Sequence, residues 1–95
     1  MKSYDYSTSQ LPTSVEEQCD QAMKNVISAL RVAGMGMKDV VRVHYLLPDR
    51  KDFPKCWPIL REWFGDVKPA ATMVQVGLME ETMKFEIEVT AHKLE

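Results

Sequence analysis

The residues of this sequence that could do chemistry form two charged pairs in strand-like segments. Arg42 and His44 alternate with valines, and Glu86 and Glu88 alternate with Ile87 and its apolar neighbours. Successive side chains of a strand point to opposite faces, so both pairs should lie on the sheet face away from the apolar residues. The same face should carry three further side chains: Met73, Gln75 and Thr90. It could hold a reactive site, be solvated, or form an interface between subunits.

Metal binding is not indicated by the histidines and cysteines. No second ligand lies at a useful spacing from His44, and Cys19 and Cys56 are far apart in the chain. Two cysteines without a signal peptide favour two semi-buried thiols in a reduced, cytoplasmic chain. We expect no metal and no cofactor.

The first element that must position these residues is a helix over residues 14–33. Ser14 and Glu17 have the spacing of a capping box, and Gly34 stands where a left-handed C-terminal cap would follow. Apolar residues recur at the helical period on one face. They are Val15, Cys19, Ala22, Met23, Val26, Ile27, Leu30 and Ala33.

A second helix is expected over residues 53–64. Asp52 is its expected N-cap, Pro58 in the second turn should distort it, and Gly65 should end it. Its apolar face comprises Phe53, Trp57, Leu60 and Phe64.

Three strands are predicted over residues 39–47, 71–78 and 84–92. In the first, one face carries Val41, Val43, Tyr45 and Leu47. The last two should pair as an antiparallel hairpin, because only a short segment joins them. The helix-covered face of that hairpin should comprise Val74, Val76, Leu78, Phe85, Ile87 and Val89.

This order of elements predicts an α+β sandwich, with two helices on one face of a mostly antiparallel sheet. Residues 14–93 form the single domain, residues 1–13 a linker or residual edge strand, and residues 94–95 could be a tag scar. A core this small leaves a single chain marginally stable, which favours oligomerisation.

Charge and hydropathy narrow the choice of partners. The formal net charge is -2, and basic residues are scattered, so nucleic acid is not indicated as a partner. No apolar run reaches the roughly 20 residues that span a bilayer. A small molecule is the expected partner.

Three stretches of the sequence together carry a resemblance to a known family. They are EEQCDQAMKNVISALRVAGMGMKDVVRVHYLLPDRKDF, REWFGDVKPAATMVQVGL and FEIEVTA. In combination they resemble the RidA family, also called YjgF-like or L-PSP endoribonuclease-like. The resemblance implies a fold like that of bacillary chorismate mutase. It also implies a homotrimer with helices outside a central barrel and a ligand cleft between each pair of subunits. Active members hydrolyse enamine or imine intermediates there to a keto acid and ammonia.

The chain departs from the family pattern at two places. The resemblance implies an arginine that binds the substrate carboxylate, and Ala71 stands at that position. The first N-terminal strand of the family also has no counterpart, although Tyr4 and Tyr6 could belong to the second.

The resemblance to the RidA family also implies roles in the ligand cleft for several other residues. Glu86 falls on the acid that positions water, or is a solvated carboxylate. Met73 replaces a pocket cysteine or similar small residue. Phe53 falls on an aromatic that the neighbouring subunit lends to the cleft, and Trp57 follows one helical turn later; alternatively, both belong to the core. Arg42 is a candidate substitute for the missing arginine.

Three functions therefore compete. The first-ranked is a trimeric protein whose clefts bind a small metabolite, neutral or apolar, without efficient 2-iminoacid deamination. The second is an enamine or imine deaminase of altered specificity that uses Glu86. An endoribonuclease ranks last, because the chain has no basic stripe and no histidine pair for phosphate chemistry.

Overall fold

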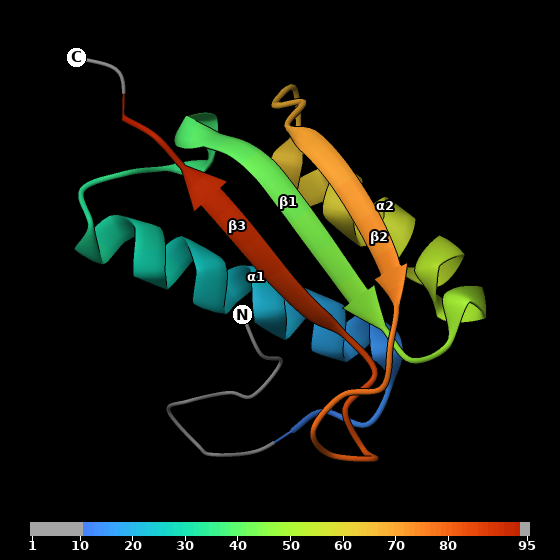
Figure 1. Ribbon diagram of the computed structural model, residues 1–95. Helices are drawn as coiled ribbons and strands as arrows, with labels where there is room; N and C mark the ends of the chain where they lie inside the picture. The colour runs from blue at the N-terminus through green and yellow to red at the C-terminus, as the bar shows by residue number, and fades with distance from the viewer. Residues whose placement is uncertain (1–10, 94–95) are drawn as a thin grey trace.

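The computed structural model describes residues 11–93, so the predicted roles of Tyr4 and Tyr6 and the ends of the chain lie outside the described residues. Figure 1 shows both helices on one side of the sheet. In chain order the helices and strands are α1 (Val15–Val32), β1 (Val40–Leu47), α2 (Phe53–Phe64), β2 (Ala70–Gln75) and β3 (Glu86–Ala91), with 3-10 turns at Met37–Asp39 and Arg50–Asp52. The α+β class is confirmed.

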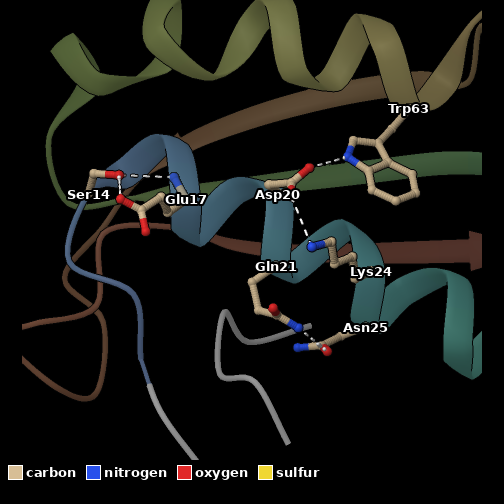
Figure 2. Close-up of polar contacts among 7 residues, drawn as sticks. All are labelled: Ser14, Glu17, Asp20, Gln21, Lys24, Asn25 and Trp63. Atoms are coloured by element: carbon tan, nitrogen blue, oxygen red, sulfur yellow. Dashed lines mark hydrogen bonds and ion pairs between the residues drawn. The ribbon is translucent and has the colours of Figure 1, made fainter. Parts of the chain in front are cut away.

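The ends of α1 follow the sequence signals. The Glu17 backbone N–H donates to Ser14 Oγ at 3.1 Å, and the Ser14 hydroxyl donates to Glu17 Oε1 at 3.1 Å (Figure 2). After the helix, Gly34 has φ of 74° and the Met35 N–H donates to the Leu30 carbonyl at 2.8 Å. A left-handed residue at this point favours glycine, so the sequence fixes where α1 stops.

The second helix has the predicted bounds with two differences in detail. Asp52 occupies the N-cap position, but its carboxylate accepts from Lys55 Nζ at 3.2 Å and makes no capping bond. The helix continues through Pro58, and Gly65, with φ of 57°, ends it. The expected distortion at Pro58 therefore does not interrupt α2.

The sheet is mixed, with strand order β2-β1-β3. The prediction that the last two strands pair as a hairpin is therefore wrong. β1 pairs with β2 in parallel and with β3 antiparallel, so β1 separates the two strands that were expected to pair. Because α2 connects β1 to β2, the chain returns to its starting end and the two strands run parallel. Residues 76–85 then cross to the other edge of β1 (Figure 1).

Alternation in β1 holds except at Val41. Val43, Tyr45 and Leu47 are buried as predicted, and Phe85 and Ile87 from the β3 side lie in the same core. The β1–β3 register shifts between Val40 and Arg42, which leaves Val41 half exposed and buries Val40 in its place. A bulge inserts one residue into the ladder, so the side chains before it exchange faces.

The prediction of which β2 side chains lie on the helix-covered side of the sheet is also wrong. Ala71, Met73 and Gln75 pair with Val43, Tyr45 and Leu47, which places them on the helix-covered side of the sheet. Val74 pairs with Leu46 on the open side and is 41% exposed; Val76 and Leu78 lie outside the strand. β2 is one of the two edge strands of the described sheet, and all six of its residues are exposed. In β2 the apolar side chains therefore do not indicate which side of the strand faces the helices.

Hydrogen bonds of two α1 residues, Gln18 and Asp20, tie this helix to other parts of the fold. The buried Gln18 amide donates to the Pro12 carbonyl at 2.8 Å and to the Thr82 carbonyl at 2.9 Å, and it accepts from the Lys84 N–H at 2.7 Å. These bonds hold the segment that crosses from β2 to β3. Between the helices, Trp63 Nε1 donates to Asp20 Oδ1 at 2.8 Å (Figure 2).

The two cysteines are free and fully buried between the helices, deeper than the semi-buried placement expected. The pKa of Cys19 is raised far above its usual value, chiefly by a hydrogen bond with Cys56 and to a smaller extent by burial of the thiol. Both features keep that thiol protonated and unreactive.

Candidate ligand-binding site

A cavity of about 640 Å³ lies between α2 and β2. Its lining residues come from β1, from α2, from the loop after α2 and from the exposed strand β2. The residues that matter for its chemistry are Tyr45, Phe53, Trp57, Arg61, Lys68, Ala71 and Met73.

Aromatic rings form one continuous wall of this cavity. The ring centroids of Tyr45 and Phe53 are 5.6 Å apart, and those of Phe53 and Trp57 are 5.8 Å apart. The Arg61 guanidinium carbon then lies 5.6 Å from the centre of the Trp57 ring, within cation–π range. Phe53, Trp57 and Arg61 follow one another at intervals of four, so successive turns of α2 stack them along one face.

Trp57 does not belong to the core, which was the competing interpretation for this residue. Its side chain is 47% exposed, whereas Leu60 and Phe64 of the same helix are buried. Phe53 is partly buried and packs against the core while it also lines the cavity. The predicted apolar face of α2 thus divides between the core and the cavity.

The charged groups of this cavity are all cationic. Arg61 and Lys68 line it, and no aspartate or glutamate is among its lining residues. No carboxylate within residues 11–93 forms an ion pair with either cation. Burial, with a smaller contribution from Cys19, raises the pKa of Tyr45 to about 12, so the phenol is neutral at physiological pH.

The charged side chains singled out in the two strands lie, as predicted, on the open face of the sheet, which is the face away from both helices. His44 pairs with Glu88 and Leu46 with Glu86, so Arg42, His44, Glu86 and Glu88 share that face. Arg42, His44 and Glu88 line a small cavity of about 120 Å³. His44 Nε2 is buried there without a hydrogen-bond partner among the described residues.

The predicted site residues therefore fall on opposite sides of the sheet. Phe53, Trp57, Ala71 and Met73 come together around the large cavity, whereas Glu86 and Arg42 belong to the open face. Sequence reasoning missed Tyr45, Arg61 and Lys68 as lining residues. For Arg61 a signal was present, because it follows Trp57 by one helical turn.

Neither a metal centre nor a membrane span is found in the described part of the chain. No group of three histidine, cysteine, aspartate or glutamate side chains within residues 11–93 is placed to hold a metal ion. Of the helices in that range, none combines the length and the apolar composition that crossing a bilayer requires.

Comparison with known proteins gives a consistent result. The family model described as endoribonuclease L-PSP matches residues 3–93. A RutC family protein of Pyrococcus horikoshii is 34% identical over 79 residues, which cover 83% of this chain and 63% of that protein. A 2-iminobutanoate/2-iminopropanoate deaminase of Mus musculus is 35% identical over 88 residues, 92% of this chain and 65% of the relative. The chain thus spans just under two thirds of these curated relatives.

The fold is also found among solved structures. RidA from the Antarctic bacterium Psychrobacter sp. PAMC 21119 superposes with a TM-score of 0.87 at 26% identity, over 94% of this chain and 72% of that one.

Proposed function

Because the chain belongs to the endoribonuclease L-PSP family, the family to which RidA and YjgF proteins belong, we propose that it binds a small organic metabolite in the cavity between α2 and β2. The fold is the chorismate-mutase-like fold of that family. The cavity itself carries the proposal: it is concave, has aromatic and apolar walls, and offers a few polar groups that could orient a ligand. Ligand sites in proteins have this composition, and their volumes run from roughly 300 to 1,000 Å³.

Efficient deamination of 2-iminoacids by the usual route is not expected. The resemblance to the RidA family calls for an arginine where Ala71 lines the cavity. A methyl group cannot make the forked, charged hydrogen bonds by which a guanidinium binds a carboxylate. Loss of such a pair costs about 1.5–3 kcal/mol.

We further propose that the working unit is a homotrimer, with each cleft formed by two neighbouring subunits. The cavity contains no carboxylate, and Glu86 lies on the opposite face of the same sheet. An acid that positions water in this cavity must therefore come from another chain. Val74, 41% exposed on the open face, is one of the apolar side chains that such an assembly would cover.

The alternative is an enamine or imine deaminase of altered specificity that uses Glu86. The observation that favours it is the 35% identity to a protein named 2-iminobutanoate/2-iminopropanoate deaminase. An endoribonuclease ranks below both, because a chain with formal net charge -2 does not attract a phosphate backbone.

A turnover assay distinguishes the binding protein from the deaminase alternative. We would generate 2-iminobutanoate in situ and follow its loss with this protein and with the mouse deaminase at equal subunit concentration. The expected turnover is about 100-fold lower than that of the relative, the factor that corresponds to roughly 3 kcal/mol. Comparable turnover would favour the deaminase alternative.

A further inference from the structure

We infer that the cavity between α2 and β2 selects aromatic carboxylates, with Arg61 and Lys68 at the acid and Trp57 and Phe53 at the ring. The inference rests on the proposed binding function and names the class of its ligand. It assigns the anion contact to the α2 wall and the adjoining loop, not to β2, where Ala71 stands.

The first argument is electrostatic. The protein as a whole is acidic, with formal net charge -2, yet the ionised groups that line this cavity are two cations. Neither cation has a carboxylate partner within residues 11–93, so no existing ion pair must break when an anion enters. A cleft lined by one sign of charge concentrates ligands of the opposite sign.

The second argument is the placement of Arg61. Its guanidinium lies over the Trp57 ring, with 5.6 Å from the guanidinium carbon to the ring centre. A cation–π contact uses the charge of the guanidinium and not its hydrogen bonds, so the N–H groups of Arg61 can still donate to a carboxylate. The contact with Trp57 also restricts the Arg61 side chain before the ligand arrives, which lowers the entropy cost of binding.

The third argument concerns the body of the ligand. The tilted series Tyr45–Phe53–Trp57 leads up to that guanidinium, and Trp57 presents 47% of its surface. Aromatic rings pack against one another at centroid separations of roughly 4.5–7 Å. A ring lying on Trp57 and Phe53 would hold its acidic substituent close to Arg61. Lys68, on the loop that closes the same cavity, supplies a second donor.

The test is calorimetric titration of the intact protein with three probes. Phenylacetate has both the ring and the charge, phenylacetamide keeps the ring without the charge, and cyclohexylacetate keeps the charge without the aromatic ring. We expect phenylacetate to bind about tenfold more tightly than the amide, since a hydrogen bond to a charged group outweighs a neutral one. Cyclohexylacetate should bind more weakly than phenylacetate.

Variants locate the effect. Arg61→Gln and Lys68→Gln should each weaken phenylacetate binding about fivefold, in line with the modest strength of exposed charge pairs, and leave the amide unchanged. Arg31→Gln and Lys38→Gln are the matched controls, because both residues are exposed and neither lines the cavity. These controls remove the same charge and should leave both dissociation constants unchanged.

The outcomes distinguish the inference from the function on which it rests. Equal affinity for acid and amide would overturn the anion assignment while leaving a small-molecule site in place. Equal affinity for phenylacetate and cyclohexylacetate would overturn the aromatic selection. Equal weakening by the cavity variants and their controls would overturn the assignment to Arg61 and Lys68. If no probe bound at all, the inference would fail, and the proposed function would be restricted to small molecules of another class.

Discussion

Replacing Ala71 by arginine should raise the hydrolysis of 2-iminobutanoate by about five- to thirtyfold. Ala71 is exposed, lines the cavity from β2 and pairs with Val43, so a longer side chain can enter the cavity without displacing the core. A charged hydrogen bond to the substrate carboxylate contributes about 1.5–3 kcal/mol. A third cation beside Arg61 and Lys68 costs about 0.5–1 kcal/mol in water, the smaller cost applying to the weaker bond. The net gain of roughly 1–2 kcal/mol gives the stated factor, at 1.36 kcal/mol per tenfold.

The assay follows loss of the imine generated in situ, with the natural chain and two control variants. Ala71→Leu adds bulk without charge and should leave the rate unchanged. Ala71→Lys adds charge without the planar fork and should give a smaller gain than arginine. Glu86→Ala in the Ala71→Arg background should abolish the gain if Glu86 positions water. A rate for Ala71→Arg no higher than that of Ala71→Leu would refute the reasoning.

Three further predictions concern stability and assembly. Gln18→Met should lower the free energy of unfolding by about 2–4 kcal/mol, because it leaves the Lys84 N–H and the Thr82 carbonyl without their partner; a loss below about 1 kcal/mol in urea titrations would contradict this role. Burial raises the pKa of Tyr45 to about 12, so the unfolded state ionises first and stability should fall between pH 10 and pH 12. Relative to Tyr45→Phe the loss should reach about 2–3 kcal/mol, and identical pH profiles for the two proteins would argue against it. Sedimentation equilibrium should give about three times the chain mass of 10.9 kDa; a single-chain mass would exclude a site shared between subunits.

The helices could be predicted because their signals are local. The capping pair Ser14 and Glu17 and the left-handed glycines Gly34 and Gly65 act within one turn of the residues they affect. Sheet pairing is not local, which explains the hairpin error. Neighbouring strands in sequence were assumed to pair, but β1 lies between β2 and β3, and the crossing segment is held by Gln18 from α1.

The same distinction applies to the candidate site. Of the five residues predicted for the ligand cleft, Phe53, Trp57, Ala71 and Met73 line one cavity, whereas Arg42 lies on the opposite face of the sheet. The side of the sheet that Ala71 and Met73 face could not be derived from alternation, because all residues of β2 are exposed and its one valine, Val74, lies on the side away from the helices. Arg61 follows Trp57 by one helical turn, but only the structure shows its guanidinium over the Trp57 ring and places the residue at the cavity.

The most direct test of the central claim is a ¹H–¹⁵N correlation spectrum recorded during titration with phenylacetate. The account predicts that the shifted amides cluster at Phe53–Phe64, in the loop that follows, and at Ala71 and Met73 of β2. Shifts confined to Arg42, His44 and Glu88 would place the site on the open face of the sheet and contradict the account.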